Sequence, residues 1–177
     1  MARMRWVVCV FALLWPTSAW SASEVPASIP RLRPLGGRAA EMLERGTAQS
    51  PTFWDLVARL GQSDVVVYVE IAPRRPGSPA GATRFVTVST DLRFLHVTLD
   101  RELPPRALVA LLGHELQHAL EVAEAPGIRD VATFRQYYEG FGLHACDGRR
   151  FDSNAAREAG RRVRQELGAP PGSGEAL

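Results

Sequence analysis

The residues best suited to chemistry are His114, Glu115 and His118, which form an H-E-x-x-H pattern. Residues four apart lie on one face of a helix, about one turn from each other. Two imidazoles in that arrangement can bind one zinc ion, and the Glu beside the first His can take a proton from a zinc-bound water. The pattern therefore predicts a metal-dependent hydrolytic site. The alternatives are a metal site without catalysis, or a coincidental spacing of two surface histidines.

The segment around this pattern has the features of a long helix. Pro104 and Pro105 suit a helix start, and the next proline is Pro126. At about 100° per residue, one apolar arc faces a core and the two histidines lie at its edge, beside a cleft. The small residues Ala107 and Ala110 share the histidine side, where they are expected to leave room for a metal and a substrate. The arc consists of Leu108, Leu111, Leu112, Leu116, Ala119 and Ala123.

Three strands are expected before this helix. Residues 64–71 are short and β-branched, and residues 84–89 and 92–99 flank a turn at Thr90 and Asp91. We therefore predict an α+β fold in which a small antiparallel sheet of about three strands packs on the central H-E-x-x-H helix. Flanking helices are expected on both sides of this unit. They are 38–45, a helix from 51 that is capped by Ser50 and stopped by Gly61, a helix that is capped by Asp130 and runs to about 139, and 154–167 capped by Asp152 or Ser153.

The first residues have the features of an export signal. Arg3 and Arg5 precede an apolar run of about ten residues, which is too short to span a membrane, and small residues follow it. We expect a signal peptide at 1–23, a lead-in segment with a short helix at 24–50, a zincin-like metal-binding domain at 51–167 and a disordered tail at 168–177. The lead-in is expected to be loose through residue 37.

Export determines the charge and cysteine content of the mature chain. Removing Arg3 and Arg5 from 21 basic residues balances the 19 acidic ones, so nothing attracts the chain to nucleic acid or to an anionic membrane. No stable membrane span is expected after signal cleavage. Cleavage also removes Cys9 and leaves Cys146, which cannot form an intrachain disulfide and is expected to be buried.

The motif and the order of the elements resemble the zincin metallopeptidases, whose H-E-x-x-H helix lies beneath a short sheet. The resemblance implies that His114 and His118 bind Zn²⁺ and that Glu115 is the general base. The extended metzincin pattern is disfavoured, because Glu121 and Glu124 stand where it has Gly and His. A gluzincin-like third ligand from a later helix leaves two candidates. Glu139 lies about twenty residues beyond His118, and Asp152 opens a D-x-x-A pattern in which Asp replaces Glu, as in aspzincins.

Several neighbouring residues have open roles. Glu121, one turn beyond His118, is expected to orient that ring from behind, to bind the metal itself, or to be a plain exposed Glu. His144 is a further candidate ligand in a loop. Tyr137 and Tyr138 are expected to pack in the core, with donation to a developing oxyanion as the alternative.

These residues lead to two functional hypotheses. The first is an exported zinc-dependent hydrolase, a small peptidase acting on a peptide or protein substrate, with the strand ending at Leu99 aligning an extended peptide. The second is a non-catalytic metal-binding or structural envelope protein that retains the histidine pair. Metal storage or delivery is a third reading.

Overall fold

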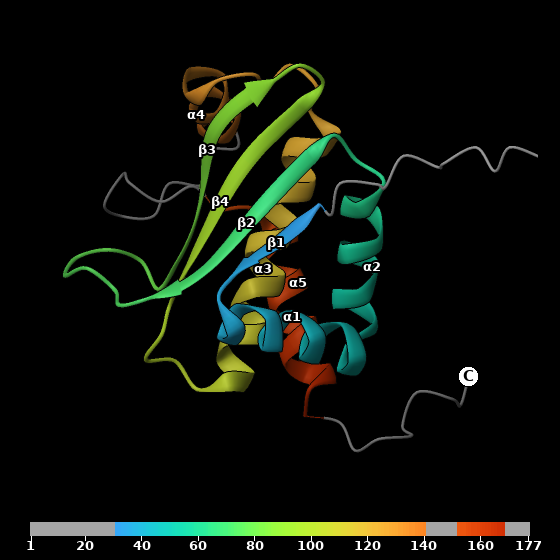
Figure 1. The fold of residues 1–177 in the computed structure, drawn as a ribbon, viewed down its shortest axis with the longest axis vertical. Coiled ribbons are helices and arrows are strands. Elements are labelled where there is room, and N and C mark those ends of the chain that lie inside the picture. Colours follow the sequence, from blue (N-terminus) through green and yellow to red (C-terminus); the bar gives the residue numbers. More distant parts are fainter. Residues whose placement is uncertain (1–30, 141–151, 169–177) are drawn as a thin grey trace, which may run out of the picture.

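A computed structural model describes residues 31–140 and 152–168 of the chain. These residues form five helices and one four-stranded mixed sheet (Figure 1). The predicted signal peptide, the 141–151 segment with His144 and Cys146, and residues 169–177 of the predicted tail lie outside the described residues.

The sheet contains strands from two separate parts of the chain. Its order is β1-β2-β4-β3, in which β1, β2 and β4 are parallel and β3 is antiparallel to β4. The helices α1 (Gly37–Gln49) and α2 (Pro51–Gly61) form the crossover that parallel pairing of β1 and β2 requires. The strands are β1 (Leu32–Leu35), β2 (Val65–Ala72), β3 (Gly81–Ser89) and β4 (Leu92–Asp100).

The α+β fold class is confirmed, but the predicted antiparallel sheet of about three strands is wrong. The hairpin of β3 and β4 forms around Thr90 as expected, yet β4 lies between β2 and β3, and β1 adds a fourth strand. Burial explains this order. Leu95, Val97 and Leu99 of β4 are fully buried, whereas β3 buries only Phe85, so β3 is suited to an edge. The lead-in expected to be loose through residue 37 contains β1.

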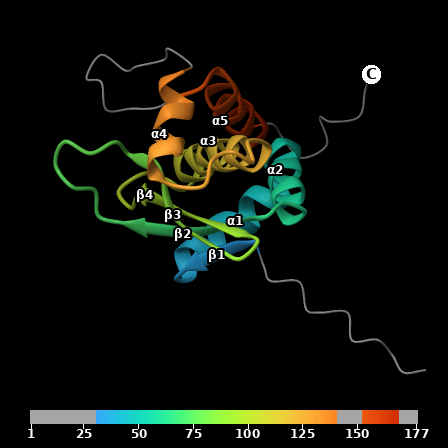
Figure 2. The same cartoon turned by 90° about the horizontal axis from the view of Figure 1, so that it is seen from above.

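The helix α3 (Pro105–Glu124) contains the H-E-x-x-H pattern and lies between the sheet and α5 (Figure 2). It is therefore buried on more sides than the predicted arc, and Val109, Leu120 and Val122 join the core. No helix among the described residues combines the length and apolar character that crossing a bilayer requires. The other helices are α1 (Gly37–Gln49), α2 (Pro51–Gly61), α4 (Val131–Glu139) and α5 (Asn154–Glu166).

Three predicted N-caps are confirmed by hydrogen bonds. Ser50 accepts from the Phe53 amide at 3.0 Å, and Asp130 accepts from the Thr133 amide at 2.7 Å. At α5 the cap is Ser153, which accepts from the Ala156 amide at 2.9 Å. The choice of Ser153 matters for the site, because it leaves the Asp152 carboxylate free for another role.

A buried arginine fixes the far end of α3 against the sheet. Arg93 lies on the inner face of β4 and is 1% exposed. Its guanidinium pairs with both Asp64 carboxylate oxygens, at 2.6 and 2.8 Å. It also donates to the carbonyls of Val122, Ala123 and Ala125 at 2.6 to 3.0 Å. These carbonyls lie at the end of the helix, where the regular i to i+4 hydrogen bonds stop, so Arg93 acts as an additional cap beside the Ala125 and Ile128 amides.

Candidate metal centre

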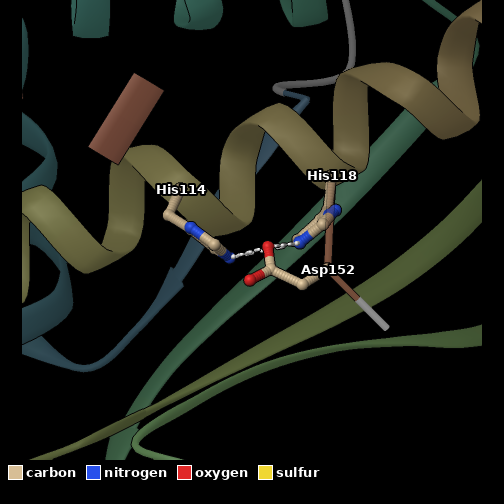
Figure 3. A group of neighbouring side chains, drawn as sticks. All are labelled: His114, His118 and Asp152. Atoms are coloured by element: carbon tan, nitrogen blue, oxygen red, sulfur yellow. Dashed lines mark hydrogen bonds and ion pairs between the residues drawn. The ribbon is translucent and has the colours of Figure 1, made fainter. Parts of the chain in front are cut away.

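The structure brings three predicted ligands together. His114 and His118 project from one face of α3 toward Asp152, which precedes α5 (Figure 3). The two Nε2 atoms are 3.2 Å apart. Oδ1 of Asp152 lies 3.5 Å from His114 Nε2 and 3.9 Å from His118 Nε2. One ligand atom from each residue thus meets at one point, and all lie within 4.8 Å of one another.

The Asp152 carboxylate is incompletely satisfied at this point. Its Oδ2 lies 3.5 Å from Nε of Arg157, whereas the buried Oδ1 has no hydrogen-bond partner. A buried carboxylate oxygen without a donor is costly, and such groups in native proteins are usually completed by water or an ion. Asp152 Oδ1 therefore fits a metal ligand.

The spacing of the three ligand atoms suits zinc. Zinc holds imidazole nitrogen and carboxylate oxygen at about 2.0–2.2 Å in tetrahedral geometry, which places neighbouring ligand atoms about 3.3–3.6 Å apart. The separations between the ligand atoms of His114, His118 and Asp152 are 3.2, 3.5 and 3.9 Å. Two nitrogens and one oxygen also match the donor set of catalytic zinc sites, which keep a fourth position open.

A hydrogen-bond network behind the site orients His118. Its Nδ1 lies 2.9 Å from Oε2 of Glu121, and a carboxylate is an acceptor, so Nδ1 carries the hydrogen and Nε2 is free for the metal. Glu121 also accepts from Tyr138 Oη at 3.0 Å and from the Ser153 hydroxyl. Tyr138 is in turn 3.2 Å from the His118 carbonyl. Of the three roles considered for Glu121, the structure places it behind the ring.

Burial and charge shift the pKa values of these groups in opposite directions. Burial lowers the pKa of His118, but the hydrogen bond to Glu121 and the nearby carboxylates outweigh it, so the net shift is upward. The pKa of His114 is lowered, first by burial and then by the charge of His118. Burial opposes the charged form of Glu121, yet its hydrogen bond with His118 dominates and lowers its pKa. Glu121 therefore stays ionised and holds His118 in place.

The predicted base, Glu115, is 4% exposed and faces β3. Its Oε2 accepts from the Thr83 hydroxyl at 2.8 Å. A Cβ on Gly81 would lie 2.6 Å from Oε1 of Glu115 and 2.9 Å from Leu111, so a larger residue there would have to displace one of these side chains. Burial raises the pKa of Glu115 and outweighs the nearby charge of His118, which lowers it.

The three candidate ligands and Glu115 line one cavity of about 250 Å³. The cavity is open on one side, and its walls are formed by α3, β3 and α4. Ala107 and Ala110 do not provide the space for a ligand, as their small size had suggested, because α5 packs against that side of α3. A Cβ on Gly160 of α5 would lie 3.2 Å from the Ala110 carbonyl. The residues that line the cavity and could act on a ligand are Thr83, His114, Glu115, His118, Tyr138 and Asp152.

The other candidate third ligand is not brought to this point. Glu139 is exposed at the end of α4 and is absent from the cluster of possible ligands among the described residues. Tyr137 is half-buried and packs edge-on against Tyr138, with ring centroids 5.2 Å apart, as expected of core packing.

Sequence reasoning missed three residues that shape the site. Gly81 and Thr83 precede the strand that was expected at 84–89, and only the three-dimensional packing of β3 reveals their contacts with Glu115. Ser153 was considered only as a helix cap. Its hydroxyl also donates to Glu121, which couples the cap of α5 to the histidine network.

A comparison of the chain with models of known protein families, with characterised proteins and with solved structures gave no match.

Proposed function

We propose that this protein is an exported zinc-dependent hydrolase, most specifically a peptidase. The observation that carries the proposal is the buried Oδ1 of Asp152, which has no hydrogen-bond donor and faces the Nε2 atoms of His114 and His118. These three side chains would hold the zinc ion. When bound, zinc supplies polarisation of a carbonyl and a lower pKa for a water molecule.

Glu115 would move the proton in this reaction. It lines the same cavity as the three ligands, and its carboxylate is held by Thr83. A base accepts a proton from water and must later return it to the leaving amine. Burial raises the pKa of Glu115, which makes its carboxylate a stronger proton acceptor than an exposed one.

The edge of the sheet beside the cavity supports a peptide substrate. The strand that ends at Leu99 is β4, which is paired on both sides, so the expectation that it aligns the substrate is wrong. The strand available for pairing is β3, whose residues Gly81 and Thr83 line the cavity. An extended peptide added along this edge would cross the ligand cluster, and its backbone would provide the affinity.

The variant Glu115→Gln tests the proposal. It removes the base but keeps the shape of the side chain, so zinc content should remain and hydrolysis of a mixed peptide library should fall by at least about 100-fold. Glu124→Gln is the matched control, because Glu124 lies on the same helix and is exposed. If zinc-loaded wild-type protein cleaves no peptide, or if Glu115→Gln cleaves as well as wild type, the proposed function is wrong.

One observation favours the alternative of a structural metal site. The cluster joins the middle of α3 to the segment before α5, and Glu121 links the same two elements through Ser153. Zinc there would fasten α5 to the core without turnover. In that case a chelator should unfold the protein, and Glu115→Gln should behave as wild type.

A further inference from the structure

A second cavity lies on the face of the sheet that is turned away from α3. Its volume is about 270 Å³, and it is formed by the outer faces of β2, β4 and β3 and by the connection between β2 and β3, which projects beyond the sheet in Figure 1. Pro79, Ala80 and Ala82 line both cavities, so the two are separated only by the start of β3. We call this cavity the outer pocket. Its charged and titratable lining residues are Glu70, Arg74, Arg75, Arg84, His96 and Asp100.

The outer pocket has an excess of positive charge. Each of its two acids already has a partner: Asp100 pairs with Arg74 at 3.1 Å, and Oε2 of Glu70 lies 3.1 Å from Nε2 of His96. That contact lacks hydrogen-bond geometry, which leaves the buried His96 nitrogen without a hydrogen-bond partner.

Arg75 and Arg84 provide the unbalanced charge. Three arginines face two carboxylates in the lining, so the net charge is at least +1. Among the described residues, no acid or carbonyl pairs with the guanidinium of Arg75 or Arg84. Arg74 donates to the Ser78 carbonyl at 3.1 Å, which holds the connection between β2 and β3 beside them.

Alternation along β3 relates the outer pocket to the metal centre. Gly81 and Thr83 face α3, whereas Ala82 and Arg84 pair with Thr98 and His96 of β4 and face the outer pocket. Regular pairing continues only to Phe85, where a bulge begins. A peptide paired with the free edge between Gly81 and Phe85 would place its side chains alternately beside the ligand cluster and beside the outer pocket.

We propose that the outer pocket is a specificity subsite for an acidic side chain of an extended peptide lying along β3. This inference rests on the proposed peptidase function and names its substrate class: peptides with Asp or Glu at positions whose side chains point away from the zinc. Arg84 and Arg75 recognise the carboxylate, and the small side chain of Ala82 leaves room beside Arg84. A free anion such as phosphate would use the same guanidinium groups but would not depend on the edge of β3.

The test uses a peptide series in which a single Glu, replaced by Gln in the matched peptide, moves one position at a time past the cleavage site. We expect Glu to be preferred over Gln by on the order of tenfold in kcat/KM, as for one charge-assisted hydrogen bond at a partly exposed site. The preference should occur only at alternate positions. Arg84→Gln should abolish it, whereas Arg164→Gln, an exposed arginine on α5, should leave it unchanged.

Binding of the same peptides to the full-length Glu115→Gln variant, measured by fluorescence polarisation, separates this inference from the proposed function. If Glu peptides bind more tightly than Gln peptides while wild type cleaves neither, the proposed hydrolase function is wrong and the proposed subsite is supported. If wild type cleaves Glu and Gln peptides equally, the proposed subsite is wrong and the proposed hydrolase function is supported. Failure of Glu peptides to bind, binding of inorganic phosphate alone, or a preference that persists in Arg84→Gln would each overturn the inference.

Discussion

The helix α3 contacts two buried charged clusters that differ in how they are completed. At its C-terminal end, Arg93 meets two carboxylate oxygens of Asp64 and the carbonyls that end the helix, so donors and acceptors are matched. In its middle, His114, His118 and Asp152 bring ligand atoms within 4.8 Å of one another, and Asp152 Oδ1 has no donor. The protein alone satisfies the first cluster. The second has a deficit of positive charge.

The difference teaches how a buried polar cluster can be assigned to structure or to binding. Burying an unsatisfied charged oxygen lowers stability, and folding gains nothing from it unless a ligand completes it. The Arg93 cluster therefore belongs to the fold, whereas we propose that the Asp152 cluster binds a cation. Substitutions in the two clusters should separate stability from metal binding.

The largest effect is expected at Arg93. Arg93→Met should lower the free energy of unfolding by about 3 kcal/mol, because it removes a fully buried guanidinium and leaves the helix-ending carbonyls and the partly exposed Asp64 without that donor. Urea unfolding measures this loss, which zinc should not selectively repair. Arg59→Met is the control, because the ion pairs of Arg59 with Asp55 and Glu124 are exposed, and its effect should be within about 1 kcal/mol. Equal losses in the two variants would contradict the role of Arg93.

Zinc should stabilise the protein through the second cluster. At free zinc 100-fold above Kd, binding adds about 2.7 kcal/mol to the free energy of unfolding. His118→Ala should lose this gain, whereas His96→Ala, on the outer face of the sheet, should keep it. Thermal melts with and without zinc measure the difference. A zinc-dependent shift of the same size in His118→Ala would show that the metal binds elsewhere.

A smaller effect on zinc affinity is expected at Glu121, which contacts the side of the His118 ring that faces away from the metal. Glu121→Gln should weaken zinc binding by about 10- to 100-fold, because the neutral amide no longer fixes the tautomer of His118 or increases its basicity. Competition with a zinc chelator measures the affinity. Glu124→Gln, one turn further along α3 and exposed, should bind zinc as wild type. If both variants bind alike, the contact between Glu121 and His118 has no role in metal affinity.

The smallest effect is the decrease in the free energy of unfolding that should follow protonation of Asp64 in acid. Burial raises its pKa, but the hydrogen bond and charge of Arg93 outweigh this, so the pKa in the folded state lies below the ordinary value of 3.8. The stabilisation is therefore present above that value and is lost as pH falls through the lower folded pKa. Urea unfolding between pH 2 and pH 6 should show a shallower dependence of the free energy of unfolding on pH in Asp64→Asn than in wild type. An unchanged slope in Asp64→Asn would contradict the prediction.

Local features of this fold were predictable from the sequence, and non-local ones were not. The α3 helix and the Ser50 and Asp130 caps follow from residues a few positions apart. The parallel placement of β1 and β4 depends on contacts between distant segments, and the short β1 has no distinctive pattern of its own.

The site shows the same division. The sequence identified His114, Glu115, His118 and Asp152 as candidates, but choosing Asp152 over Glu139 required knowing that Ser153 takes the cap and that α4 ends away from the cluster. Thr83 could not be predicted because its contact with Glu115 joins residues 32 positions apart.

The most direct test of the metal centre is the zinc content of purified protein, measured by elemental analysis after dialysis, for wild type, Asp152→Asn and Glu139→Gln. The cluster predicts one zinc per chain in wild type and in Glu139→Gln, and a clear loss in Asp152→Asn. A wild-type protein without stoichiometric zinc, or an Asp152→Asn variant that retains it fully, would contradict the assignment.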